Sequence, residues 1–311
     1  MTKTTTDEQM MRRCLQLARC GGTATRPNPM VGAVITDADG RIIGEGYHRR
    51  CGEAHAEVNA FNAVSDSDRH LLHDATIYVS LEPCSHYGKT PPCADRIISE
   101  GVRRVVVGCI DPFAKVQGRG ISKLRNAGID VTTGILEQEC QWLNRRFFTF
   151  HSKQRPYIIL KWAQSSNAYI DDHGTAAAFS TPLTQILVHQ LRAEEDAIVV
   201  GHTTDSREHP LLTVRHWTGR NPWRFVLSHD NTIDDILSTC REQQLQSLIV
   251  EGGRQTLEAF IRAGLYDEVR RETATAVTIS DGTPAPTLPD DLIAIGQETY
   301  GTNLIEHFKR K

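Results

Sequence analysis

Three stretches of the sequence decide the fold of the first half of the chain: HAEVNAFNAV (55–64), TIYVSLEPC (76–84) and PPC (91–93). In the first stretch, alanine and valine recur at three- and four-residue spacings, which predicts a helix. The second stretch is rich in β-branched and aromatic residues and predicts a strand over 76–81. We therefore expect Cys84 at the end of a strand and Cys93 at the start of a helix over 94–99.

These stretches also contain the residues of a catalytic zinc site. Catalytic zinc takes three protein ligands and leaves a fourth position for water, whose pKa it lowers to about 7. His55, Cys84 and Cys93 meet that count. Glu57 can reach the open position without being a ligand, as in zinc deaminases, where this Glu carries protons. The alternatives are ordinary helix residues with buried cysteines, or a zinc finger, for which no fourth ligand has suitable spacing.

Length and composition indicate a two-domain globular enzyme. The chain has 311 residues, against about 150 for one typical domain. Its net charge of −3 gives no electrostatic reason to expect nucleic-acid binding. The first 16 residues lack the apolar core of a signal peptide, and no run approaches the ~20 apolar residues of a membrane span. We expect a soluble cytoplasmic protein whose eight cysteines are two zinc ligands and six reduced thiols.

The pattern along the chain predicts a mixed sheet flanked by helices in residues 1–150, a linker over 151–156, and a second α/β domain over 157–311. In the second domain, two glycines at 252–253 lie between a strand and a helix. Such a junction lets backbone amides approach an anion at the helix N-terminus. In the first domain we expect helices over 7–19, 120–127 and 135–148 and strands over 31–36, 41–46, 104–108 and 130–132. In the second we expect strands over 157–162, 196–201 and 247–251 and helices after Pro182 and over 255–263.

Four motifs of the first half resemble the deaminase half of the bifunctional riboflavin-biosynthesis deaminase/reductase: RPNPMVG (26–32), HAE (55–57), LEPCSH (81–86) and TPPC (90–93). Eight residues separate the two cysteines, where most cytidine-deaminase-like enzymes have two. The resemblance implies a cytidine-deaminase-like fold that hydrolyses the ring amino group of 2,5-diamino-6-ribosylamino-4(3H)-pyrimidinone 5′-phosphate. Asn28 matches the family's substrate-orienting Asn. His48 and Lys89 are candidates for phosphate or ribose contacts, the alternative being solvated surface residues.

Four motifs of the second half resemble the reductase half of the same family: KWAQS (161–165), LRAEEDAI (191–198), PLLTVR (210–215) and VEGG (250–253). The resemblance implies a dihydrofolate-reductase-like fold that uses NADPH to reduce the ribosyl group to ribityl. It assigns to the substrate Arg192, Leu212, Arg215 and Glu251. It assigns to NADPH Gln164, Thr204, Glu208, Ser228, Gly253, Arg254, Gln255, Thr256, Leu257, Glu258 and Ala259.

The second half also departs from the family pattern. Residues 164–168 lack the usual Ser-x-Asp-Gly turn, and residues 174–179 lack the usual Ser and Trp. Glu208-His209 replaces an acidic pair, and the interval between Asp230 and Ser247 is short. We therefore describe this module as shortened and partly divergent.

Two alternatives stay open from the sequence. The first is a monofunctional deaminase whose C-terminal half is a non-catalytic binding or oligomerisation module. The second is a nucleic-acid editing deaminase, which flips a base into a similar zinc pocket but usually has a basic, aromatic-lined surface and closer cysteines. Whichever function holds, we expect a homo-oligomer, a dimer or a tetramer, because homo-oligomers are common among soluble enzymes.

Overall fold

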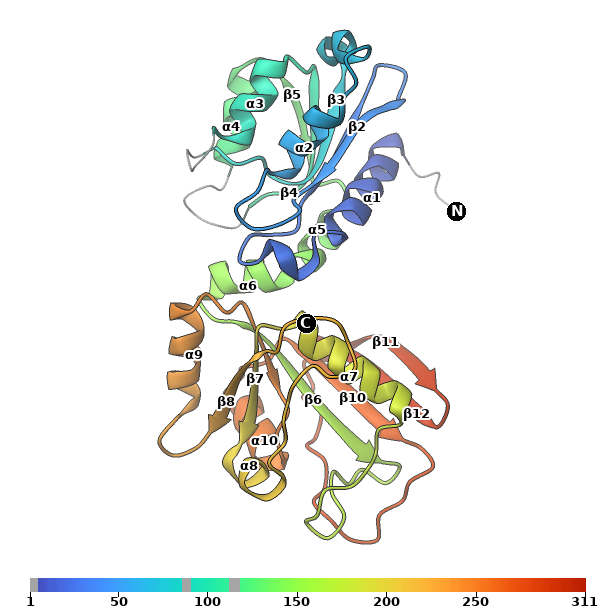
Figure 1. The fold of residues 1–311 in the computed structure, drawn as a ribbon, viewed down its shortest axis with the longest axis vertical. Coiled ribbons are helices and arrows are strands. Elements are labelled where there is room, and N and C mark those ends of the chain that lie inside the picture. The colour runs from blue at the N-terminus through green and yellow to red at the C-terminus, as the bar shows by residue number, and fades with distance from the viewer. Residues whose placement is uncertain (1–4, 86–90, 112–117) are drawn as a thin grey trace. The chain divides into compact units, whose positions relative to one another are not determined.

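The computed structural model describes residues 5–85, 91–111 and 118–311, and the chain divides into two compact units, residues 1–153 and 154–311. Figure 1 shows the elements of each unit. Residues 151–153, predicted to belong to the linker, complete the last helix of the first unit. Among the described residues, no helix is both long enough and apolar enough to cross a bilayer. All eight cysteines are free, as predicted.

The first unit contains a five-stranded mixed sheet in the order β2-β1-β3-β4-β5. Strand β1 is antiparallel to β2 and β3, and β3, β4 and β5 are parallel to one another. The strands are β1 (Gly32–Thr36), β2 (Ile42–Tyr47), β3 (Thr76–Leu81), β4 (Arg104–Cys109) and β5 (Asp130–Thr133). The helices are α1 (Thr6–Arg19), α2 (Ala56–Ala63), α3 (Cys93–Glu100), α4 (Arg119–Asn126), α5 (Glu137–Leu143) and α6 (Arg145–Lys153), with 3-10 turns at Gly22–Thr25 and Arg69–Asp74.

Helices cover both faces of this sheet. On one face, Phe61 of α2, Ile97 of α3 and Leu124 of α4 are fully buried in one apolar cluster with the strands. On the other face, Met11 of α1 and Cys140 of α5 belong to a second buried cluster. The sheet is therefore buried on both sides, which explains why its parallel strands are nearly continuous apolar runs.

Glycine in β2 lets helix α2 lie directly against the sheet. A Cβ added at Gly46 would lie 2.3 Å from the backbone nitrogen of Ala60 and 2.5 Å from the carbonyl oxygen of Ala56. No other residue can occupy this position without moving the helix. Since His55 and Glu57 stand at the start of α2, this close contact helps to place them.

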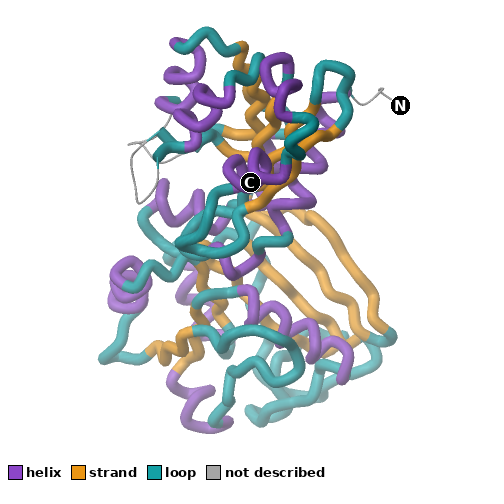
Figure 2. Tube along the Cα trace, turned by 45° about the horizontal axis from the view of Figure 1, so that its top comes forward, coloured by secondary structure: helices purple, strands orange, loops and turns teal. Residues whose placement is uncertain are grey.

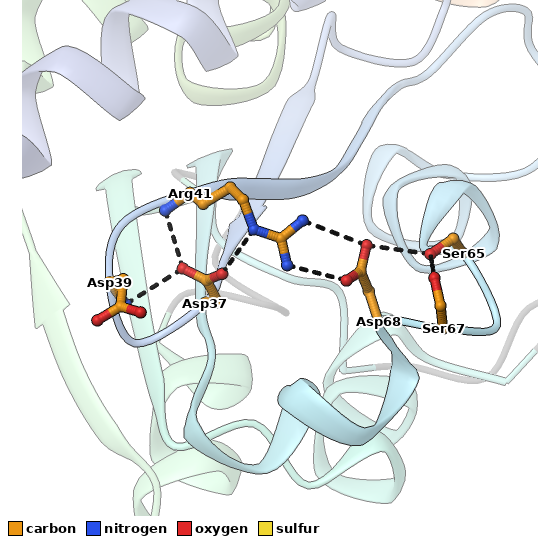
Figure 3. A network of polar contacts seen from close by, with 6 residues as sticks. All are labelled: Asp37, Asp39, Arg41, Ser65, Ser67 and Asp68. Atoms are coloured by element: carbon orange, nitrogen blue, oxygen red, sulfur yellow. Dashed lines mark hydrogen bonds and ion pairs between the residues drawn. The ribbon is translucent and has the colours of Figure 1, made fainter.

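The turn between β1 and β2 is held by an ionic network (Figure 3). Asp37 accepts hydrogen bonds from the backbone N–H of Asp39 at 3.1 Å and of Arg41 at 2.9 Å. The guanidinium of Arg41 pairs with Asp37 and also with Asp68 at 2.8 Å. Asp68 in turn accepts a hydrogen bond from the hydroxyl of Ser65. The network therefore ties the turn to the segment that follows α2.

The helix predicted over 135–148 is two helices, α5 and α6, with a break at Asn144. The Asn144 amide donates to the carbonyl oxygen of Met30 at 2.9 Å and accepts from its N–H at 2.8 Å. This pairing with a distant backbone segment holds the chain at the break, and helical periodicity does not reveal it.

The second unit contains a seven-stranded sheet in the order β11-β12-β10-β6-β9-β7-β8, whose strands run side by side in Figure 2. The last five strands in this order are parallel, and β12 is antiparallel to both neighbours. The strands are β6 (Tyr157–Ser165), β7 (Ala197–Gly201), β8 (Trp223–Leu227), β9 (Ser247–Val250), β10 (Glu268–Ala274), β11 (Leu292–Tyr300) and β12 (Asn303–Arg310). The helices are α7 (Pro182–Glu194), α8 (His202–Glu208), α9 (Ile233–Glu242) and α10 (Arg254–Arg262).

Helices α9 and α10 pack Ile236 and Phe260 against one face of this sheet. On the other face, Leu191 of α7 packs against a cluster that contains Ile198 and Ile249. The short interval after Asp230 contains all of α9. Local sequence patterns do not predict β8, α8, α9 or the strands after α10. In several of these elements charged residues interrupt the apolar ones, as in EVRRETA (268–274) and NLIEHFKR (303–310).

Candidate functional site

Three predicted ligands meet at one end of the first sheet. His55 is the residue before α2, Cys84 follows β3, and Cys93 opens α3. The Nδ1 atom of His55 lies 3.7 Å from Sγ of Cys84 and 3.3 Å from Sγ of Cys93, and all three ligand atoms lie within 4.8 Å of one another. Tetrahedral zinc with ordinary bond lengths needs about 3.6 Å between nitrogen and sulfur ligands. The cluster therefore has the size of one zinc site.

The protonation of the two thiols also suits a cation. A hydrogen bond from the Cys93 side chain lowers the pKa of Cys84 to about 4, and the pairing with Cys84 raises the pKa of Cys93. The backbone N–H of Cys93 donates a further hydrogen bond to Sγ of Cys84 at 3.2 Å. Two sulfurs this close share one proton because two thiolates would repel each other. A bound cation removes that repulsion, so the donor set fits zinc.

Glu57 lies beside the cluster without belonging to it. It is in the first turn of α2 and is 3% exposed. Burial raises the pKa of Glu57, and the negative charge of Cys84 acts in the same direction. A buried carboxyl group two residues from a metal ligand has the position that proton transfer at a zinc site needs.

His48 holds Asn28 next to this cluster. Nδ1 of His48 lies 3.1 Å from the carbonyl oxygen of Ala54, which only accepts, so Nδ1 carries the ring proton. Nε2 then accepts a hydrogen bond from the Asn28 side-chain amide at 3.1 Å. His48 is 3% exposed and burial lowers its pKa, so it is a neutral, buried residue and not solvated surface. Lys89 lies outside the described residues.

Glu82 is a buried carboxylate that the sequence analysis did not single out. It accepts hydrogen bonds from the backbone N–H groups of Gly120 at 2.9 Å, Gly118 at 3.0 Å, Asp111 at 3.3 Å and Ile121 at 3.4 Å. These donors lie at and before the start of α4, where an anion satisfies free amides. Since Glu82 stands two residues before Cys84, it ties the metal-binding loop to α4. The sequence signal for this role was a carboxylate directly after an apolar strand and directly before Pro-Cys.

The second unit contains a cavity of about 940 Å³. Its lining comes mainly from β6, from the segment between β6 and α7, from one side of α7, and from the segments that follow β7 and β9. Ligands of open α/β sheets bind at the carboxyl ends of parallel strands. Gly201 and Gly252 stand at two such ends, and a Cβ on either would lie within 2.6 Å of the Thr256 side chain. The two glycines therefore let the start of α10 approach both strands.

A buried ionic group forms part of the cavity wall. Arg192 of α7 donates two hydrogen bonds to Glu251, and Lys161 of β6 lies 3.6 Å from the same carboxylate. All three side chains are at most 11% exposed. Burial opposes ionisation of Glu251, but the charges of Lys161 and Arg192 outweigh it and lower its pKa to about 2. Two cations around one carboxylate leave this wall with a net positive charge, which suits an anionic ligand.

The structure brings most of the predicted reductase residues to this cavity. Its lining includes Arg192, Thr204, Glu208, Arg215, Glu251, Gly253, Arg254, Gln255 and Thr256.

The other predicted reductase residues do not line the cavity. Leu212 is buried in the apolar cluster under α7, and Gln164 is buried and accepts a hydrogen bond from Trp162. Leu257 follows Thr256 on α10 and faces the sheet, so it lies in the core and not in the cavity. Glu258 pairs with Arg254 at 2.6 Å. Ser228 and Ala259 are also absent from the lining.

The lining also contains residues that the sequence pattern did not single out, among them Lys161 and His189. Lys161 is the one charged residue of the otherwise apolar strand start YIILKW (157–162), a signal that was present. His189 lies one turn before Arg192 on α7, is 4% exposed and lines the cavity. A lone histidine in a helix gives no such signal.

The comparisons with known proteins agree with this architecture. Residues 4–109 match the profile of the cytidine and deoxycytidylate deaminase zinc-binding region. Residues 156–236 match the RibD C-terminal domain. The two units thus define a zinc-region deaminase joined to a reductase-type domain, with the predicted cytidine-deaminase-like and dihydrofolate-reductase-like sheets.

Relatives and a solved structure extend the match over most of the chain. The riboflavin biosynthesis protein RibD of Aquifex aeolicus is 35% identical over 308 residues, covering 85% of each chain. RibD of Escherichia coli is 34% identical and covers 91% of each chain. The diaminohydroxyphosphoribosylaminopyrimidine deaminase/5-amino-6-(5-phosphoribosylamino)uracil reductase of Thermotoga maritima aligns with a TM-score of 0.88 at 31% identity, over 98% of this chain and 99% of the other. The chain belongs to the RibD family and is a bifunctional riboflavin-biosynthesis deaminase and reductase.

Proposed function

We propose that the first unit hydrolyses the ring amino group of 2,5-diamino-6-ribosylamino-4(3H)-pyrimidinone 5′-phosphate and that the second reduces the ribosyl group of the product to ribityl with NADPH. The observation that supports the first step most strongly is the His55, Cys84 and Cys93 cluster with buried Glu57 beside it. The similarity to the deaminase/reductase of Thermotoga maritima supports both steps.

In the deaminase step, His55, Cys84 and Cys93 would hold zinc, which would act as a Lewis acid and lower the pKa of a water molecule toward about 7. Glu57 takes the proton of the attacking water, passes it to the ring nitrogen, and then transfers a proton to the departing ammonia. Asn28 orients the ring through its side-chain oxygen, because its amide nitrogen is held by His48.

In the reductase step, the cavity of the second unit would hold NADPH, which would supply the hydride for reduction of the ribosyl group. Arg215 lines the cavity, and its guanidinium donates a hydrogen bond to the Thr213 hydroxyl at 3.2 Å. In this proposal Arg215 binds the substrate phosphate. Arg192 holds Glu251 in place beside the sugar. Thr204 and the start of α10, Gly253–Thr256, hold the cofactor, whose phosphates suit the amides of a helix N-terminus.

One experiment tests both steps together. Zinc-loaded protein receives the diaminopyrimidinone substrate and NADPH, and ammonia release and NADPH oxidation are followed in parallel. We expect both signals in equal amounts. Ammonia without NADPH oxidation would support the monofunctional alternative, and neither signal would contradict the proposed substrate.

Binding of NADPH can be followed separately. Trp162 lines the cavity, so NADPH that enters it changes the fluorescence of this side chain. A saturable change without substrate would support the cofactor assignment, and the absence of any change would count against it. The homo-oligomer, dimer or tetramer, stays a prediction that light scattering on the purified protein tests.

A further inference from the structure

His189 connects α7 to the segment that contains Arg215. Its Nδ1 atom accepts a hydrogen bond from the backbone N–H of Arg215 at 3.0 Å. Its ring lies edge-on to that of His216, with 4.8 Å between ring centroids. Arg192, three residues later on the same helix, is 3.5 Å from the carbonyl oxygen of Thr213. One side of α7 thus contacts the segment at two points.

The hydrogen bond defines the state of the His189 ring. A backbone N–H only donates, so Nδ1 must be unprotonated and a neutral ring carries its proton on Nε2. Burial lowers the pKa of His189, and the positive charges of Arg192 and Arg215 lower it further. The charged or titratable groups that face the ring are Arg192 from α7 and Arg215 and His216 from the segment.

The rest of the segment is held by contacts around this point. Leu212 is buried against the sheet with a left-handed backbone, φ 52°. The N–H of Val214 donates to the Asn221 side chain at 2.8 Å. Among these contacts, only the His189 bond acts on the backbone of Arg215 itself, whose side chain lines the cavity.

We propose that His189 is a positioning residue of the reductase unit, which fixes the backbone of Arg215 so that its guanidinium meets the phosphate of the substrate. This inference rests on the proposed role of Arg215 as the phosphate ligand. A phosphate is recognised by a guanidinium only in a suitable orientation, so loss of the backbone anchor weakens substrate binding without touching the cofactor.

The test uses two variants of His189. His189→Asn keeps an acceptor at the position of Nδ1, and His189→Leu removes it. The substrate is 5-amino-6-(5-phosphoribosylamino)uracil, given directly so that deamination is not required. We expect His189→Leu to raise the KM for this substrate roughly tenfold, which corresponds to about 1.4 kcal/mol. We expect the KM for NADPH to stay within twofold of the wild-type value. In His189→Asn, the substrate KM should return most of the way to the wild-type value.

The pH dependence adds a readout that a purely structural role would not produce. Protonation of His189 at low pH would place a donor against the N–H of Arg215, so the substrate KM of the wild type rises as the pH falls. The substrate phosphate also titrates, near pH 6. The titration of the phosphate affects the wild type and His189→Asn equally, so comparing the two removes it. We expect the substrate KM of His189→Asn to change less with pH.

Two control variants separate the possible failures. His216→Leu removes the exposed neighbouring ring but no hydrogen bond, and we expect an unchanged KM. Arg215→Met tests the proposed function itself. If Arg215→Met raises the substrate KM and His189→Leu does not, the inference about His189 is overturned and the phosphate role stands. If Arg215→Met has no effect, the phosphate role fails. Equal effects of His189→Asn and His189→Leu would also overturn the inference.

Discussion

Arg192 and Glu251 form a bidentate ion pair in the wall of the reductase cavity. The distance is 3.0 Å between Nε and Oε1 and 2.7 Å between Nη2 and Oε2. The family resemblance assigns both residues to the substrate, and the structure shows that they bind each other. Lys161 shares the same carboxylate. The pair is therefore a preformed part of the site and not two independent ligand contacts.

Replacing Arg192 by Ala should lower both stability and substrate affinity. Glu251 would remain buried without its hydrogen-bonded partner, with the charges of Lys161 and Arg270 left to balance it. We expect this to cost about 3 kcal/mol, the lower end of the range for breaking a buried pair. The KM for the phosphorylated substrate should rise far more than that for NADPH. Urea unfolding and reductase kinetics measure the two effects.

The double variant Arg192→Ala/Glu251→Ala is the control for this prediction. It removes the uncompensated carboxylate, so it should be more stable than Arg192→Ala alone. Equal effects on the two KM values in the single variant would indicate a purely structural arginine.

The free energy of unfolding of the second unit should depend on pH through the ionisation of Glu251. Its pKa in the folded protein is about 2, below its ordinary value of 4.5. A lowered pKa means that the stabilisation is fully present above about pH 4.5 and is lost as the pH falls toward about 2. Urea unfolding followed by tryptophan fluorescence can measure this, because three of the four tryptophans lie in this unit. Glu251→Gln should have a shallower loss over the same range, and an identical slope would contradict the assignment.

Glu57→Gln should abolish deamination while leaving the metal bound. The amide has the size of the carboxyl group but cannot carry protons, so ammonia release should fall about 10²–10⁴-fold. Zinc content, measured by atomic absorption, should stay near one ion per chain. Reductase activity on the deaminated substrate is the internal control and should be unchanged. Retained ammonia release would remove Glu57 from the mechanism.

Gly46→Ala should weaken the zinc site indirectly, by displacing helix α2. The added methyl group would overlap the backbone of α2 at Ala60, and such overpacking costs about 1–3 kcal/mol. A shift of α2 moves His55 and Glu57, so zinc affinity and ammonia release should both decrease. Gly296→Ala is the matched control, because a Cβ there meets no atom within 4 Å. Normal zinc affinity in Gly46→Ala would show that α2 does not depend on this contact.

Much of the first unit was predictable because its signals are local. The strand over 76–81 and the start of α3 at Cys93 depend on short-range patterns, and both predictions are confirmed. The second unit was harder, because β10 and β12 alternate charged and apolar residues. Strand β10 pairs with β6 across 109 positions, as Glu268 does with Ile159, and with β12 across 29 to 41 positions. Local periodicity does not encode such pairings.

Residue types and spacings indicate the chemistry available to this protein: a His, two Cys and a Glu for zinc hydrolysis, and the arginines and glycines of a phosphate and cofactor site. How those groups are used depends on the fold. The tertiary structure shows that Glu82 anchors the metal-binding loop, that His48 holds Asn28, and that the cavity excludes Leu257. The physical reason is that residue type and spacing define what a side chain can bind, whereas its partner depends on long-range packing that brings distant segments together.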